Sequence, residues 1–181
     1  MAILTGMRLV IFDVDGTLVR PFTDELRPGV ADWFDAWRFM EARPLLALAS
    51  NQGGVGLRLH RERMGQDMGE YPTQAETEVR LERVARRLWI RPSLVFISFA
   101  YQFGPGRWTE TPMSAVGDVR WGRNWRMPNP GMLLAAMATA RATPLETLAV
   151  GGETLQGAAR RCGVGFAWNG RFFEMPQMVL V

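Results

Sequence analysis

Short apolar runs alternate along this chain with longer stretches of helical periodicity. The runs lie at residues 9–12, 45–49, 94–99, 148–150 and 165–168. Strands of a parallel sheet are covered by helices on both faces, so their sequences are apolar throughout instead of alternating with polar residues. The order of runs and helical stretches therefore predicts an open parallel α/β sheet with helices on both faces.

Amphipathic patterns predict the helices that connect these strands, at residues 30–37, 73–88, 131–141 and 153–162. The second of them begins with a capping-box sequence, Thr73 to Glu76, which favours a helix start. The polar residues 60–69 match no element. Residues 100–130 are rich in Gly, Pro and Trp, and this composition predicts a long functional loop.

The composition suits one globular domain spanning residues 1–181. Of the 181 residues, 48% are hydrophobic and 22% are charged, which is enough to build a core. No apolar run approaches the roughly 18–20 residues of a membrane span, and the first residues do not resemble a signal peptide. The single cysteine, Cys162, excludes an internal disulfide. We therefore expect a cytoplasmic domain without membrane contact.

The basic residues of the chain are all arginine. Lys and Arg together number 21, and no lysine occurs in the sequence. This excludes Schiff-base chemistry, lysine general bases and a Walker-type phosphate loop. The arginines of residues 80–91 alternate with Glu78 and Glu82, a pattern typical of a salt-bridged solvent face. With a net charge of only +3, nucleic acid is not a favoured partner.

Polar residues follow two of the predicted strands directly. Asp13 and Asp15 follow the first strand, and Ser50 and Asn51 follow the second. Ligands of parallel α/β proteins bind beyond the carboxyl ends of the strands. Two carboxylates at such spacing repel each other unless a cation lies between them, and Mg²⁺ is a suitable cation because it takes oxygen ligands. One carboxylate could then attack phosphorus while the other transfers a proton.

The sequence Asp-Val-Asp-Gly-Thr at residues 13–17 resembles motif I of the haloacid dehalogenase-like (HAD) phosphatases. The resemblance implies that Asp13 is the nucleophile that becomes a phosphoaspartate and that Asp15 is the general acid and base. It also implies that Mg²⁺ binds Asp13 and the backbone carbonyl of Asp15. Ser50 and Asn51 match motif II, which implies that they hold the phosphoryl oxygens. Further matches lie at residues 128–132, after motif III, and 150–151, at the start of motif IV.

The resemblance extends over about residues 8–170 and implies a three-layer, Rossmann-like fold with a central parallel sheet and little or no cap. Asn-Gln-Gly at residues 51–53 is typical of the subclass containing histidinol-phosphate, heptose-bisphosphate and polynucleotide 3′-phosphatases. The implied substrate is a phosphorylated small molecule or a phosphorylated polymer end. We expect residues 100–125 to shape access to the site. Their Trp108 and Trp121, with the following Trp125, could stack on substrate or contact a protein partner.

Two positions depart from the family pattern. The family has a lysine where this chain has Met127, and a metal-binding aspartate where it has Gly152. The neighbouring Arg126 and Glu153 are the available replacements. Arg126 could instead be an ordinary surface residue, and Glu153 an acid that stabilises the first turn of a helix.

The expected site therefore matches the family pattern at motifs I and II and departs from it at motifs III and IV. Asp13 and Asp15 carry the chemistry, Ser50, Asn51 and Arg126 bind phosphate, and the magnesium ligands are Asp13, Asp15 and Glu153. Loss of one preorganised charge typically lowers a rate by about 10²–10³. The sequence favours a Mg²⁺-dependent phosphomonoester hydrolase. The alternative is a catalytically impaired pseudophosphatase that serves as a binding or structural subunit of a larger assembly.

Overall fold

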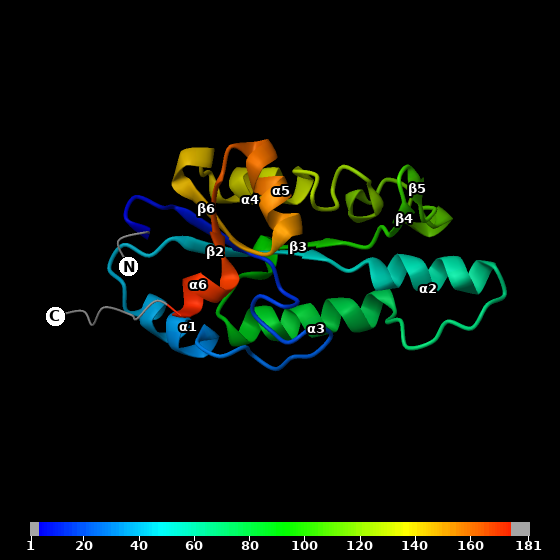
Figure 1. The fold of residues 1–181 in the computed structure, drawn as a ribbon, viewed down its shortest axis with the longest axis horizontal. Helices are drawn as coiled ribbons and strands as arrows, with labels where there is room; N and C mark the ends of the chain where they lie inside the picture. The colour runs from blue at the N-terminus through cyan, green and yellow to red at the C-terminus, as the bar shows by residue number, and fades with distance from the viewer. Residues whose placement is uncertain (1–3, 175–181) are drawn as a thin grey trace.

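The computed structural model describes residues 4–174 and is built around a five-stranded sheet (Figure 1). In spatial order the strands are β3 (Val95–Ser98), β2 (Leu45–Asn51), β1 (Leu9–Phe12), β6 (Thr147–Gly151) and β7 (Gly165–Trp168). Each neighbouring pair is parallel, with Leu9 opposite both Leu45 and Thr147. The predicted parallel α/β sheet is confirmed.

Helices cover both faces of the sheet, which gives three layers (Figure 1). On one face lie α1 (Val30–Arg38), α3 (Gln74–Arg87) and α6 (Asn169–Glu174), and on the other lie α4 (Gly131–Ala140) and α5 (Glu153–Cys162). The remaining helix, α2 (Gly53–Arg63), extends away from the carboxyl end of β2. Within residues 4–174, no helix has the length and apolar character needed to cross a membrane.

The central strand β1 explains why the apolar runs are continuous. All of its side chains are buried, because helices pack on both of its faces. The ring of Phe12 lies 5.4 Å from the ring of Trp33 and 5.9 Å from that of Phe172, both in edge-on contacts. These contacts fix the end of β1, from which the next residues of the chain leave the sheet.

The capping box predicted for α3 is present. The Thr73 hydroxyl accepts a hydrogen bond from the Glu76 amide, and the Glu76 carboxylate accepts one from the Thr73 amide. The buried stripe of the helix includes Thr77, Leu81 and Val84. This stripe holds α3 against the sheet and so fixes the positions of the side chains that border it.

Two segments differ from expectation. Helix α2 runs through residues 60–63, which the sequence left unassigned because they lack apolar periodicity. The segment 100–130 is not a continuous loop: it contains a hairpin of β4 (Gln102–Gly104) and β5 (Arg107–Trp108), followed by short 3-10 turns.

The tryptophans of this segment differ from the expectation that Trp108, Trp121 and Trp125 could stack on substrate or contact a protein partner. Trp121 is buried and packs on the ring of Phe99 at 5.6 Å. Trp125 is half-buried, and its indole N–H donates to the carbonyl of Ile97 at 2.8 Å. The turns fold back onto β3, so Trp121 and Trp125 belong to the core, and Trp108 alone remains at the hairpin.

Candidate active site

Asp13 lies directly beyond the carboxyl end of β1. Its amide donates to the carbonyl of Val150 at 3.1 Å, so the chain stays paired with β6 up to this residue. The Thr17 hydroxyl donates to the Asp13 carboxylate at 3.4 Å, and no basic side chain of residues 4–174 forms an ion pair with it. Loss of solvent contact, and to a smaller extent the charge of Asp15, together raise the pKa of Asp13 from 3.8 to about 7, against the hydrogen bonds from Val14 and Thr17, which lower it. Asp13 is therefore a half-buried, poorly solvated carboxyl group without a cationic partner among residues 4–174.

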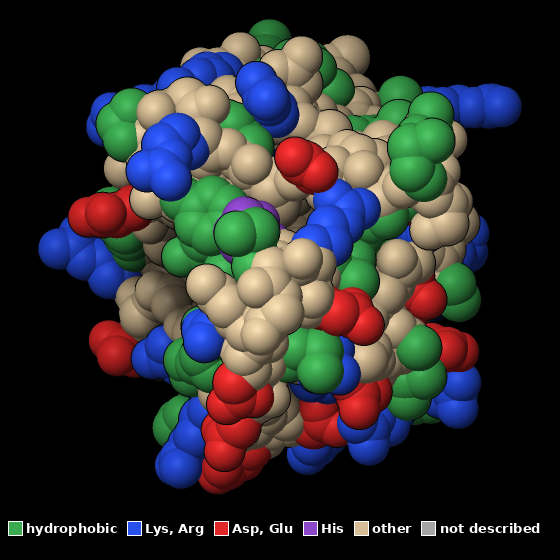
Figure 2. All heavy atoms as spheres, turned by 90° about the vertical axis from the view of Figure 1, so that its right-hand side faces the viewer, with side chains coloured by type: hydrophobic (Ala, Val, Ile, Leu, Met, Phe, Trp, Pro, Cys, Tyr) green, Lys and Arg blue, Asp and Glu red, His purple; other side chains and the backbone are tan. Residues whose placement is uncertain are grey.

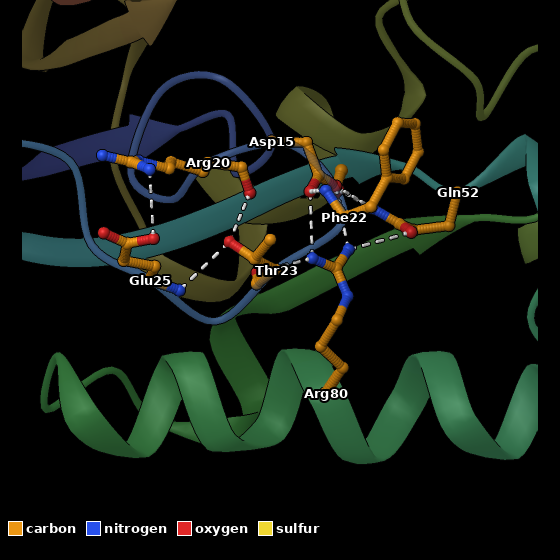
Figure 3. A network of polar contacts seen from close by, with 8 residues as sticks. Asp15, Arg20, Phe22, Thr23, Glu25, Gln52 and Arg80 are labelled. Carbon is orange, nitrogen blue, oxygen red and sulfur yellow. Dashed lines mark hydrogen bonds and ion pairs between the residues drawn. The ribbon is translucent and has the colours of Figure 1, made fainter.

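Asp15 has a very different environment, shown in Figure 3. The two terminal nitrogens of Arg80 donate to its two carboxylate oxygens, each at 2.9 Å, and the side-chain amide of Gln52 donates to one of them at 2.6 Å. The amide of Phe22 donates to the other oxygen at 3.0 Å. Burial alone would raise the pKa of Asp15. The hydrogen bonds and the charge of Arg80, together with the hydrogen bonds from Gln52 and Phe22, outweigh this effect and lower the pKa overall. Asp15 is therefore an ionised carboxylate in a fixed orientation.

Ser50 and Asn51 lie at the carboxyl end of β2, as predicted. The Ser50 side chain is buried, and its hydroxyl oxygen accepts a hydrogen bond from the Gln52 amide at 2.7 Å. The Asn51 side chain donates to the carbonyl of Met127 at 2.9 Å and accepts from the Met127 amide at 3.1 Å. Asn51 thus ties the end of β2 to the segment that leads into α4, and in this structure both ends of its amide are engaged.

Arg126 is positioned at the start of α2. One of its terminal nitrogens donates to the carbonyl of Ala100 at 2.9 Å, and the same nitrogen would lie 3.0 Å from a Cβ atom added to Gly53. Burial lowers the pKa of Arg126, and it forms no ion pair with any carboxylate in the described part of the chain. A half-buried guanidinium beside free helix N–H groups is a suitable neighbour for an anion.

Met127, at the position where the motif resemblance leads us to expect a lysine, has a side chain that is only 2% exposed. The thioether is part of the hydrophobic core. The amine that this position would supply is therefore replaced by apolar packing, and Arg126 is the cation adjacent to it in sequence.

The end of β6 forms the opposite wall of the site. A Cβ atom added to Gly151 would lie 2.9 Å from the Cβ of Asp13, so β6 approaches the nucleophile position closely. A Cβ added to Gly152 would meet no atom within 4 Å. Glu153 begins α5 and acts as its first-turn acid.

The carboxylates are not gathered into a three-membered group. Within residues 4–174, no three His, Cys, Asp or Glu side chains lie close enough together to hold a metal ion. The predicted set of Asp13, Asp15 and Glu153 therefore remains a prediction. Magnesium is often held by one or two carboxylates together with water and substrate phosphate, however. The buried and uncompensated carboxylate of Asp13 fits that requirement.

Two contributors to the site, Arg80 and Gln52, were not identified from the sequence. Arg80 was assigned to a solvent-exposed face, whereas its side chain is only 14% exposed and pairs with Asp15. Its sequence position carried a signal, because it lies three residues after Thr77 and directly before Leu81, at the border of the buried stripe of α3. Gln52 is buried beside Ser50 and belonged to the motif II match without an assigned role.

The fold can now be compared with known structures. No protein-family model matches the chain, and no curated protein matches it. The structure is similar to that of a protein from Mesorhizobium loti described as a HAD-like phosphatase, with 19% sequence identity and a TM-score of 0.57, over 87% of this chain and 69% of that one. It is also similar to D,D-heptose 1,7-bisphosphate phosphatase from B. bronchiseptica in complex with magnesium and phosphate, with 20% identity and a TM-score of 0.55, over 94% of this chain and 89% of that one.

These similarities define the fold: the chain has the Rossmann-like fold seen in structures of HAD-like phosphatases. The expected HAD-type α/β architecture is confirmed.

Proposed function

We propose that the chain is a phosphomonoester hydrolase that acts through an aspartyl-phosphate on Asp13. The observation that carries this proposal is the half-buried Asp13 carboxyl group with its raised pKa, without an ion-pair partner among the described residues, directly beyond the central strand. Buried carboxyl groups with strongly shifted pKa values are concentrated at functional sites. Ser50 lies at the end of the adjacent strand β2, and α2 begins directly after it; the Ser50 hydroxyl and the amides of the first turn of α2 supply hydrogen-bond donors for phosphoryl oxygens.

The roles of the two aspartates follow from their environments. A carboxylate oxygen of Asp13 attacks phosphorus, the bond from phosphorus to the ester oxygen breaks, and the leaving oxygen takes up a proton that comes from solvent and passes through Asp15, which is a carboxylate again after the transfer. Water then attacks phosphorus of the aspartyl-phosphate and gives a proton to Asp15, which releases Asp13 and inorganic phosphate. The ion pair with Arg80 holds Asp15 beside this path as a carboxylate, the form that accepts the proton from water.

We propose Mg²⁺ as the cofactor, bound by the Asp13 carboxylate and the backbone carbonyl of Asp15, with Glu153 as a further candidate ligand. When bound, the ion would neutralise the charge that Asp13 and the phosphate bring together. The remaining binding tasks fall to the chain itself: Ser50 donates to the phosphoryl group, and the Arg126 guanidinium attracts the anion to the start of α2.

Turnover of p-nitrophenyl phosphate by the purified protein tests this proposal. We expect Mg²⁺-dependent hydrolysis by the wild type, its loss in Asp13→Asn and its retention in Asp35→Asn, a matched control whose side chain is 69% exposed on α1. Addition of a chelator should abolish the activity reversibly. Equal background turnover by wild type and Asp13→Asn would refute the proposal.

The second candidate is a pseudophosphatase that retains the scaffold as a binding or structural subunit. It is favoured by the apolar packing of Met127 and by the empty space at Gly152, because both remove a charge that the family uses. Thermal shift with inorganic phosphate distinguishes the cases. Stabilisation by phosphate without turnover would support a binding role, since a ligand that binds the folded state raises its melting temperature.

The partners that we propose follow from the same site. The substrate would be a phosphorylated small molecule or a phosphorylated polymer end, and nucleic acid in general is not favoured. At the end of the molecule formed by α2 and the β4–β5 hairpin, apolar and arginine side chains lie side by side (Figure 2). Phe103, Met113 and Val116 are exposed there or in the following turns, which supports residues 100–125 as a contact surface for a protein partner. We propose a cytoplasmic location on the basis of the single cysteine.

A further inference from the structure

The hydrogen bonds of Arg80 extend beyond Asp15 and join three separate segments of the chain (Figure 3). From α3, Arg80 donates to both oxygens of Asp15, to the side-chain oxygen of Gln52 at 3.1 Å and to the carbonyl of Thr23 at 3.1 Å. Arg80 and Asp15 are both largely buried, with side chains 14% and 21% exposed. Such a two-bonded pair defines the orientation of the carboxylate as well as its position.

The chemistry of these partners allows only one orientation of the Gln52 amide. A guanidinium can only donate hydrogen bonds, and an ionised carboxylate can only accept them. The oxygen of Gln52 must therefore face Arg80, and its NH₂ group must face Asp15, which it reaches at 2.6 Å. The same NH₂ group lies 2.7 Å from the Ser50 hydroxyl oxygen. Arg80 thus determines which end of Gln52 faces Ser50.

This orientation also determines where the proton of the Ser50 hydroxyl points. The NH₂ group of Gln52 donates to the Ser50 oxygen, so that oxygen acts as an acceptor in this contact. The hydroxyl proton must then be directed away from Gln52. Ser50 is buried at the carboxyl end of β2, next to the strand that carries Asp13, so the proton is available to an oxygen atom bound beyond these two strands.

We propose that Arg80 and Gln52 are positioning residues for the phosphate site: Arg80 fixes the Asp15 carboxylate and the Gln52 amide, and Gln52 turns the Ser50 hydroxyl into a donor for the phosphoryl group. The effect on turnover rests on the proposed function, whereas the effect on phosphate binding does not. Among the described residues, Arg80 and Gln52 contact the proton carrier Asp15, and Gln52 contacts Ser50, but neither contacts Asp13. They act through Asp15 and Ser50.

The arginines of α3 provide matched controls for the test. Arg86 is on the same helix, pairs only with Glu82, and is 76% exposed. Substitution of Arg86 removes the same charge from α3 without changing the hydrogen bonds of the site. Gln52→Met keeps the size and flexibility of the side chain but removes its donor and acceptor, so the fold is retained.

The experiment measures inorganic phosphate affinity by calorimetry and p-nitrophenyl phosphate turnover for Arg80→Lys, Arg80→Ala, Gln52→Met and Arg86→Gln. We expect Gln52→Met to weaken phosphate binding about tenfold, because the Ser50 donor is no longer directed. Arg80→Lys keeps the charge without the fork and should lower kcat about 10–100-fold with a smaller change in KM. Free guanidinium ion should restore part of the turnover of Arg80→Ala but none of that of Asp15→Asn.

The outcomes separate this inference from the proposed function. Turnover and phosphate affinity of the Arg80 and Gln52 variants equal to those of Arg86→Gln would overturn the inference and leave the hydrolase proposal intact. Absence of turnover in the wild type, with phosphate affinity that still depends on Gln52, would refute the hydrolase and support the positioning role. Absence of both phosphate binding and turnover would overturn both. Melting curves identify any variant that fails to fold, and Arg80→Lys then replaces Arg80→Ala as the test.

Discussion

Replacement of Asp13 by asparagine should stabilise the protein at alkaline pH, although it removes the proposed nucleophile. The substitution keeps the shape of the side chain and removes its titratable group. Burial raises the pKa of Asp13 from 3.8 to about 7 in the folded protein. Each pKa unit corresponds to about 1.4 kcal/mol, so ionised Asp13 lowers the free energy of unfolding by about 4 kcal/mol when the pH is above both values.

The sign of the pH dependence follows from proton binding. Between about pH 4 and pH 7 the folded state retains the Asp13 proton that the unfolded state has released, so wild-type stability falls as the pH rises through this window. The asparagine variant has no titratable group at this position, so its stability does not fall with pH for this reason. It loses about 1 kcal/mol through its poorer hydrogen bond with Thr17. A net gain of about 3 kcal/mol at pH 8 corresponds, for a chain of this size, to a rise of roughly 6–12 °C in Tm.

Thermal unfolding followed by circular dichroism, with a metal chelator present, measures this effect. Wild type, Asp13→Asn and Asp35→Asn are compared at pH 4 and at pH 8. We expect the Tm of Asp13→Asn to exceed that of wild type at pH 8 and the difference to shrink or reverse at pH 4, while Asp35→Asn follows wild type. A difference between Asp13→Asn and wild type that is independent of pH would show that Asp13 is not held in a poorly solvated environment, and the reasoning would fail.

Three further substitutions have defined expectations. Gly152→Asp should be tolerated, because a Cβ atom added there meets no atom within 4 Å and the residue has a φ of −105°. Calorimetry should show that this variant binds Mg²⁺ more tightly than the wild type. Unchanged Mg²⁺ affinity would contradict the proposed position of the metal. Asn51→Ala should lower the free energy of unfolding in urea by about 2–3 kcal/mol, since two backbone groups of Met127 lose their partner. Thr73→Ala should cost about 1 kcal/mol in the same assay by removing the capping box of α3, without changing phosphate affinity.

The sheet and its helices could be predicted because each depends on local patterns. Strands buried on both faces need continuous apolar runs, and the fully buried β1 begins and ends where its run does. The bounds of the partly exposed edge strand β7 also coincide with its run. The capping box placed the start of α3 for the same reason, since its hydrogen bonds join residues three apart. Helix α2 was not predicted at any of its residues, because most of its sequence is polar and has no continuous buried stripe.

The site could be predicted only in part, because its side chains are oriented by partners distant in sequence. The positions of Asp13 and Ser50 follow from strand ends. The pairing of Arg80 with Asp15 joins residues 65 apart, and no local pattern encodes it. The burial of Trp121 likewise depends on turns that pack against the end of β3. The composition of residues 100–130 alone is typical of an exposed loop, so this burial could not be predicted from it.

The contact between Asn51 and Met127 has an evolutionary consequence. Asn51 recognises the peptide groups on both sides of residue 127 and makes no demand on its side chain. The path of the chain into α4 is therefore secured independently of which amino acid occupies this position. A substitution at position 127 therefore leaves the hydrogen bonds that hold this part of the backbone in place. Loss or recovery of an amine there becomes a single reversible step that leaves the architecture of the protein intact.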